Sequence, residues 1–193
     1  MYTCEYRKKK PLVAHGYYNG PEEISPEFDP QNYRGYPAPS MAFAVQVAEV
    51  EVDPATGKAE LLSLTAAHDL GRAINPLLAE GQIEGGAAQG IGWALMEDVQ
   101  FENGKIVNPN FHDYKMLTIK DMPEISPILI ESIDPNGPFG AKGLGEPAMV
   151  PTAPAIINAI YDAVGVRIKD LPAISEKIYK GLKQASSIRS KLE

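Results

Sequence analysis

A glycine-rich segment at residues 140–147, GAKGLGEP, carries one lysine and one carboxylate. Runs of glycine indicate a backbone that bends sharply or lies close to another group. Burial can make a carboxylate on such a loop a competent general base near neutral pH, and this is the chemistry we consider for Glu146. The alternative is a solvated carboxylate that precedes a helix and interacts favourably with its dipole. The residue types alone leave both interpretations open.

Two glutamines form a second candidate group. Gln82 and Gln89 are seven residues apart, which is about two turns of a helix, so they share one helix face with Gly85 and Gly86. An amide among small residues can both donate to and accept from a flat polar heterocycle. Ordinary surface glutamines are the alternative interpretation.

Several other chemistries are not supported by the sequence. The segment DPATGKA, residues 53–59, lacks the leading glycine and the Ser or Thr of a phosphate-binding loop, so we expect a hairpin turn. The histidines His15, His68 and His112 lie in different segments without neighbouring ligands, and no metal site is predicted from them. Cys4 lies in a charged terminus, so we do not expect it to be catalytic.

The segments that would position these residues begin with a β-hairpin. Residues 42–52 and 59–67 alternate apolar and polar side chains around the DPATGK turn. A helix is predicted over residues 76–98, with Asn75 as its cap and Pro76 in the first turn. Each glycine inside it disfavours the helix by about 1 kcal/mol relative to alanine, so we expect another backbone or a ligand to lie close.

The second half of the chain mixes strands and helices. Asn103-Gly104 predicts a type I′ hairpin turn, and residues 127–132 predict a buried strand. A helix within residues 151–165 is expected to be capped by Thr152 and ended by Gly165. A short strand at residues 166–168 and a last helix capped by Ser175 complete the pattern. This order predicts an α+β fold, with an extended arm at residues 1–40, a lobe at 41–185 and a tail at 186–193.

Composition narrows the class of protein. The chain has 193 residues and a formal net charge of -7, without the dense basic stripe of a nucleic-acid binder. No run approaches the ~20 apolar residues of a membrane span. With a single cysteine, no internal disulfide is possible. We therefore expect a cytoplasmic protein that binds neither nucleic acid nor membrane.

Two long motifs carry a resemblance to a known family. Residues 68–98, HDLGRAINPLLAEGQIEGGAAQGIGWALMED, and residues 136–168, NGPFGAKGLGEPAMVPTAPAIINAIYDAVGVRI, resemble the large, molybdenum-binding subunit of the xanthine dehydrogenase / aldehyde oxidase family. The resemblance implies the C-terminal lobe of a molybdopterin-binding domain. It further implies hydroxylation of an aldehyde or N-heterocycle with oxygen from water. The implied cofactor is molybdopterin with molybdenum, in bacteria often as the cytosine dinucleotide.

The resemblance also assigns expected roles to individual residues. Glu146 corresponds to the family's active-site glutamate, which takes a proton from the attacking hydroxyl. Gln82 matches the glutamine that contacts the pterin. Gly143 and Gly145 would let backbone N–H groups approach the metal site. Lys142 either orients the loop or approaches the cofactor.

The chain lacks the upstream half of the family's large subunit, including the Gly-Gly-Phe-Gly-type loop. We therefore expect an upstream molybdopterin-binding chain, an Fe–S subunit and a flavin (FAD) subunit as partners, in an oligomer that acts on a small-molecule substrate. The isolated chain is expected to be inactive. The alternative function is a non-catalytic remnant or interaction module that keeps the fold without the cofactor.

Overall fold

The computed structural model describes residues 14–17, 29, 31–34 and 40–189. Its contacts divide the chain into two units, Met1–Pro39 and Ser40–Glu193. In the first unit, Asp29 and Arg34 form an antiparallel bridge around a turn, and the Asp29 carboxylate accepts the N–H of Gln31. Most of the predicted arm at residues 1–40 lies outside the described residues.

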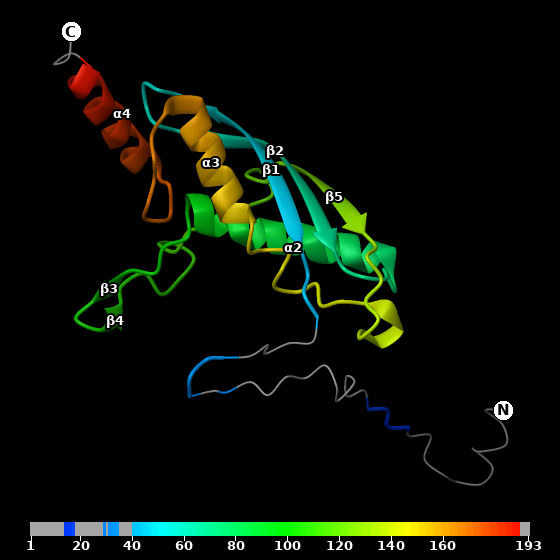
Figure 1. Ribbon diagram of the computed structural model, residues 1–193. Coiled ribbons are helices and arrows are strands. Elements are labelled where there is room, and N and C mark those ends of the chain that lie inside the picture. Colours follow the sequence, from blue (N-terminus) through cyan, green and yellow to red (C-terminus); the bar gives the residue numbers. More distant parts are fainter. Residues whose placement is uncertain (1–13, 18–28, 30, 35–39, 190–193) are drawn as a thin grey trace. The chain divides into compact units, whose positions relative to one another are not determined.

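The second unit is built on a three-stranded sheet with the order β1-β2-β5. β1, Ala44–Val52, pairs antiparallel with β2, Ala59–Asp69, as the alternating pattern predicted. β5, Glu124–Ile130, pairs parallel with the other side of β2. The parallel pairing requires a long connection between β2 and β5, and this connection contains the glycine-rich helix (Figure 1).

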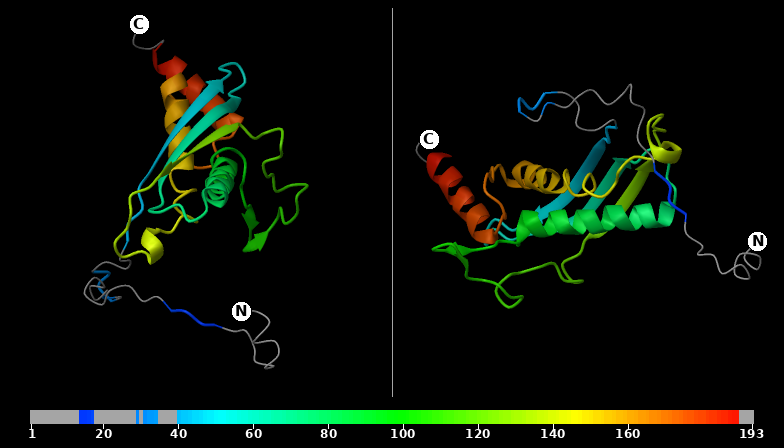
Figure 2. Two further views of the ribbon diagram at one scale, coloured as in Figure 1. Left: turned by 90° about the vertical axis from the view of Figure 1, so that its right-hand side faces the viewer. Right: turned by 90° about the horizontal axis from the view of Figure 1, so that it is seen from below.

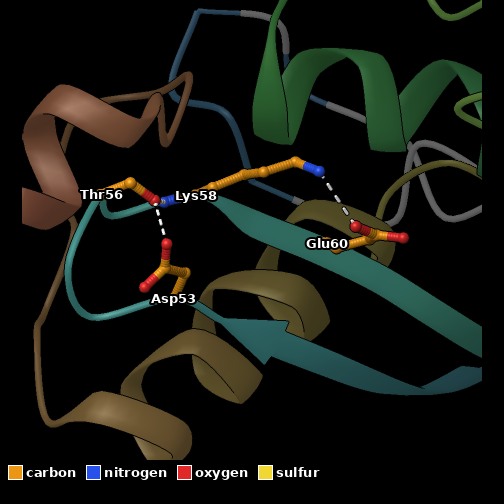
Figure 3. Close-up of polar contacts among 4 residues, drawn as sticks. All are labelled: Asp53, Thr56, Lys58 and Glu60. Carbon is orange, nitrogen blue, oxygen red and sulfur yellow. Dashed lines mark hydrogen bonds and ion pairs between the residues drawn. The ribbon is translucent and has the colours of Figure 1, made fainter.

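The hairpin turn between β1 and β2 is closed by Asp53. Its carboxylate accepts a hydrogen bond of 2.6 Å from the Thr56 hydroxyl (Figure 3). It accepts a second one, of 2.8 Å, from the Ala55 N–H. The hydrogen bond from Thr56 and, to a smaller extent, the one from the Ala55 N–H hold the pKa of Asp53 below its usual value. These contacts confirm that DPATGKA is a hairpin turn. The neighbouring Lys58–Glu60 pair is exposed, and such pairs contribute little to stability.

The three main helices are α2, Pro76–Leu95, α3, Thr152–Val164, and α4, Ser175–Arg189. α2 runs across the strands, and α3 contacts β1 (Figures 1 and 2). The core joins inward side chains of β2 to all three helices, and its fully buried members include Leu64, Ile91, Ile156, Ile160 and Ile178. These side chains place the helices on one face of the sheet. Mixed sheet and packed helices confirm the α+β class.

Two local signals acted as predicted. The side chain of Asn75 accepts a 3.2 Å hydrogen bond from the Leu78 N–H and caps α2. In the short hairpin of β3, Phe101–Glu102, and β4, Lys105–Ile106, the turn residues Asn103 and Gly104 have φ values of 49° and 78°. A type I′ turn requires positive φ at both positions.

Three expectations were wrong. The strand predicted at residues 127–132 is present, but β5 runs from Glu124 to Ile130, and its side chains alternate between exposed and partly buried because only one of its faces is covered. Residues 166–168 form no strand, since Val166 packs against Gly181 of α4 instead of pairing with the sheet. Thr152 does not cap α3. Pro151 occupies that position, and the buried Thr152 side chain faces α2.

One other feature bears on the expected boundaries. α4 continues to Arg189, through the first residues of the segment predicted as a tail. None of the helices in the described part of the chain is long and apolar enough to span a membrane.

Candidate active site

The candidate residues lie on two segments that are far apart in sequence. Lys142, Gly143, Gly145 and Glu146 belong to the loop at residues 141–151, between the short 3-10 helix η2, Pro138–Gly140, and α3. Gln82 lies in the second turn of α2. The loop packs along α2, and its two ends are held by different contacts.

The start of the loop pairs with the residues that directly follow β2. Gly71 and Ala141 form an antiparallel bridge, flanked by 2.8 Å hydrogen bonds from Arg72 N to Gly140 O and from Lys142 N to Leu70 O. Gly71 has a φ of 66°, and a side chain there would collide with the Gly140 carbonyl oxygen. Glycine meets both requirements. The two motifs that carry the family resemblance are therefore joined by backbone contacts.

A buried ion pair reinforces this junction. The Lys142 Nζ lies 2.6 Å from Asp69 Oδ2, and each side chain is only 9% exposed. Asp69 also accepts the Gly71 N–H at 3.1 Å. Burial by itself raises the pKa of Asp69, but the Lys142 ammonium and the Gly71 N–H outweigh it, so the pKa lies below its usual value. Lys142 is thus directed into the junction with β2.

The end of the loop is held against α2 by small residues. A Cβ atom added at Gly86 would lie 2.6 Å from Ala148 Cβ, and one added at Gly90 would lie 2.5 Å from Thr152 Cβ. Both distances are shorter than real side chains allow, so Gly86 permits a close approach of the loop and Gly90 a close approach of the first residue of α3. The predicted close approach is confirmed at Gly86 and Gly90. At Gly81 and Gly85 the space beside the helix is open instead.

Substitutions at two neighbouring glycines of α2 test this packing. We expect Gly85→Ala to stabilise the cofactor-free protein by up to ~1 kcal/mol, because helix propensity improves and nothing lies nearby. Gly86→Ala gains the same propensity but must push against Ala148. Overpacking of this kind costs roughly 1–3 kcal/mol, and Gly86→Ala should be less stable than Gly85→Ala by that amount. Urea unfolding of both variants measures the difference, and equal stability would contradict the packing.

Glu146 lies between the two held ends and is exposed. Its backbone carbonyl accepts the Met149 N–H at 3.0 Å, which forms a turn. Among the described residues, none donates a hydrogen bond to its carboxylate. The alternative, that Glu146 interacts with the dipole of the following helix, is weakened because α3 begins only at Thr152, six residues later.

Gln82 meets the loop beside Glu146. Its Nε2 atom lies 3.9 Å from the position of a Cβ added at Gly145. Gln82 and Gln89 are both exposed on α2 together with Gly85, whereas Gly86 is buried. The structure therefore brings Gln82, Gly145 and Glu146 to one open surface. The cavity of about 230 Å³ lined by Val99, Phe111 and Tyr114 contains none of these residues.

Three positioning contacts were not foreseen from the sequence. The Lys142 ammonium donates to Asp69, although the two residues are 73 positions apart in the sequence. Gln46 donates a 3.0 Å hydrogen bond to Ala148 O and lies 3.1 Å from His68 Nε2. A signal for Gln46 does exist: it is the one polar residue among the inward positions of β1, which otherwise carry alanine and valine.

In the described part of the chain, no acidic, His or Cys cluster could hold a metal ion.

Comparison with known proteins decides the family. Residues 1–123 match the family model described as a molybdopterin cofactor-binding domain. The chain belongs to the molybdopterin cofactor-binding domain family. It is 41% identical over 141 residues to a putative xanthine dehydrogenase molybdenum-binding subunit of Escherichia coli, covering 72% of this chain and 19% of that protein. The match confirms the resemblance to the xanthine dehydrogenase / aldehyde oxidase family.

Solved structures of family members have the same fold. The aldehyde oxidoreductase from Desulfovibrio gigas superimposes with a TM-score of 0.68 at 42% identity, covering 74% of this chain and 15% of that one. The family model ends before Glu146. The carbon monoxide dehydrogenase large chain of Hydrogenophaga pseudoflava, 28% identical, matches 93% of this chain and 23% of its own length. This molybdopterin-binding chain thus spans about a fifth of the curated relatives it matches.

Proposed function

We propose that this chain supplies the base and one wall of the cofactor site of a molybdenum hydroxylase. The reaction would add oxygen from water to a carbon of an aldehyde or N-heterocycle. One observation carries the proposal. The Gln82 amide, expected to contact the pterin, lies beside Gly145, the residue before the exposed Glu146, although Gln82 and Gly145 are far apart in sequence.

The residues present fit molybdopterin. Pterins are flat heterocycles with several hydrogen-bonding groups, and the Gln82 amide can donate to and accept from such a ring. A Cβ at Gly81, Gly85 or Gly143 would meet nothing within 4 Å, so the surface beside Gln82 is open. No described residue accepts a hydrogen bond from the N–H of Gly143 or Gly145. Gln82 and these two N–H groups would hold the cofactor.

Glu146 is the base in this proposal. When bound, the cofactor supplies a redox-active molybdenum that accepts electrons from the substrate. A carboxylate has only acceptor atoms when ionised, so Glu146 can take a proton from the hydroxyl nucleophile and hold it. Its carboxylate is not used by any described neighbour, which leaves both oxygens available. The backbone turn at Met149 limits the directions in which the side chain can point.

Lys142 has an orienting role in this proposal. Its ammonium group is paired with Asp69 inside the junction, which favours orientation of the loop over direct approach to the cofactor. Gly143, the next residue, is exposed. The pair would therefore set where the loop begins, while the glycines after it turn toward the cofactor.

Further chains complete the site in this proposal. Relatives are named as parts of larger assemblies, among them the large subunit of nicotine 6-hydroxylase and the gamma subunit of the 6-hydroxypseudooxynicotine dehydrogenase complex, both of Paenarthrobacter nicotinovorans. We infer that the remaining molybdopterin-binding part, Fe–S clusters and FAD reside outside this chain, and that the cofactor is the cytosine dinucleotide form. An open surface at Gln82 and Glu146 agrees with a site completed by other segments.

The experiment that tests the proposal uses Gln82→Ala in the assembled enzyme. Loss of one or two hydrogen bonds, at about 0.5–1.5 kcal/mol each, should weaken retention of the cofactor roughly 2–160-fold. Molybdenum per protein, measured by elemental analysis after dialysis, should fall. The rate per remaining molybdenum should change much less, because Gln82 takes no part in the proton transfer.

Glu84→Ala is the matched control for this experiment. Glu84 is exposed and lies two residues further along α2, on the opposite flank of the helix from Gln82. Its removal should leave the molybdenum content unchanged. Equal molybdenum content in both variants would contradict the assigned role of Gln82. An assembled wild-type protein without molybdenum would favour the alternative function, a non-catalytic interaction module.

A further inference from the structure

The side-chain amide of Gln46 links the sheet to the end of the loop at residues 141–151. Gln46 on β1 and His68 on β2 both point toward the helices, and His68 is fully buried. The Gln46 Nε2 atom lies 3.1 Å from His68 Nε2 and 3.0 Å from Ala148 O. One amide group therefore touches two strands and the loop at once.

The chemistry of these three groups determines the orientation of the amide. An amide nitrogen only donates, so His68 Nε2 must accept, and the imidazole carries its proton on Nδ1. Burial lowers the pKa of His68 and so favours this neutral form. With the amide turned over, the Gln46 oxygen would face the Ala148 carbonyl oxygen, and two acceptors repel each other. His68 thus directs the second N–H of Gln46 toward Ala148.

Ala148 is the point where the loop end is held. It is fully buried, its Cβ packs against Gly86, and it lies two residues after Glu146. The Lys142–Asp69 pair holds the other end. Glu146 is exposed between these two fixed points, so a shift of Ala148 moves the carboxylate.

The polar pair is not the arrangement expected for stability alone. In the described structure, the buried Gln46 Oε1 and His68 Nδ1 atoms have no hydrogen-bond partner. An unsatisfied buried polar group costs about 1–3 kcal/mol, and apolar side chains of similar shape avoid that cost. A function of the directed N–H group explains why a polar pair lies here.

We propose that Gln46 is a positioning residue, oriented by His68, that places the Glu146 carboxylate through its hydrogen bond to Ala148. This inference rests on the proposed function of Glu146 as the base. Displacement of a reacting group by about 1 Å can reduce a rate by roughly 10²-fold. The contact therefore acts on rate and leaves the cofactor contacts of Gln82 untouched.

The test is Gln46→Met in the complete molybdenum-containing enzyme. Methionine keeps the length of the side chain and removes the donor. We expect a rate per molybdenum about 10–100-fold lower, with KM and molybdenum content little changed. Hydrogen exchange at the Met149 and Val150 amides, which donate to Glu146 O, should become faster. Val47 lies on the exposed face of the same strand, so Val47→Met should change neither the rate per molybdenum nor the exchange of these amides.

Combination with Glu146→Gln separates the two proposals. If Gln46 acts through Glu146, Gln46→Met should add nothing further in the Glu146→Gln background, because the positioned group is already gone. Additive losses would overturn the inference, as would unchanged exchange or an unchanged rate per molybdenum in Gln46→Met. If Glu146→Gln alone kept the wild-type rate per molybdenum, the proposed function would fail instead. Should Gln46→Met not fold, Gln46→Asn, whose shorter amide cannot span both partners, gives the same readouts.

Discussion

Replacement of Glu146 by glutamine should lower the rate per bound molybdenum by about 10²–10⁴-fold, the usual effect of a lost general base. The substitution keeps the size and shape of the side chain and removes the proton acceptor. Stability and molybdenum content should stay close to wild type, because Glu146 is exposed and no described residue bonds to its carboxylate. Single-turnover kinetics, normalised to molybdenum, measure the effect.

Glu102→Gln is the control for the Glu146 experiment. Glu102 is an exposed carboxylate on β3, and its substitution should leave the normalised rate unchanged. If Glu146→Gln retained its rate per molybdenum, the loop would have a structural role only. A loss of molybdenum equal to the loss of rate would place Glu146 among the cofactor contacts and not at the proton transfer.

Replacement of Lys142 by methionine should destabilise the fold by roughly 3–5 kcal/mol, the usual effect of leaving one member of a buried ion pair uncompensated. Asp69 would remain buried with its charge and without its partner. The double variant Lys142→Met/Asp69→Leu should recover much of the loss, because an apolar pair can replace a buried ion pair at little cost. Urea unfolding of the three proteins at pH 7 measures these differences.

The effect of Lys142→Met should depend on pH. Because the pKa of Asp69 is lowered in the folded protein, the pair contributes its full stability above the unfolded value, about 3.9, and loses it as the pH falls through the folded value. The difference in the free energy of unfolding between wild type and Lys142→Met should therefore become smaller in acid. A constant gap would mean that the variant disturbs packing and not charge.

Lys180→Met is a matched control for ion pairing. Lys180 and Glu176 are also 2.6 Å apart, but their side chains are 67% and 65% exposed. Exposed pairs of this kind contribute about 0.3–0.5 kcal/mol, so the control should be nearly neutral. A loss as large as that of Lys142→Met would show that burial is not the cause.

Local patterns were sufficient for most of the fold. The alternation in β1 and β2, the Asn75 cap and the Asn103-Gly104 turn each depend on residues close in sequence, so each was predicted and found. The motifs around Gln82 and Glu146 also identified the family, because their order and spacing are specific. Errors arose where a segment packs against a distant helix, as at Thr152 and Val166.

The sequence alone was enough to assign the α+β class, the family and the candidate residues Gln82 and Glu146. Only the tertiary structure shows which groups hold the two ends of the loop that carries Glu146. The partner of Lys142 is 73 residues away on β2, and the partner of Ala148 is 102 residues away on β1. Hydrophobic burial brings such segments together. Because it is non-directional, it does not specify which polar atoms then lie within about 3 Å of one another. The contact at Ala148 also depends on the packing of α2, where Gly86 lets the loop approach closely.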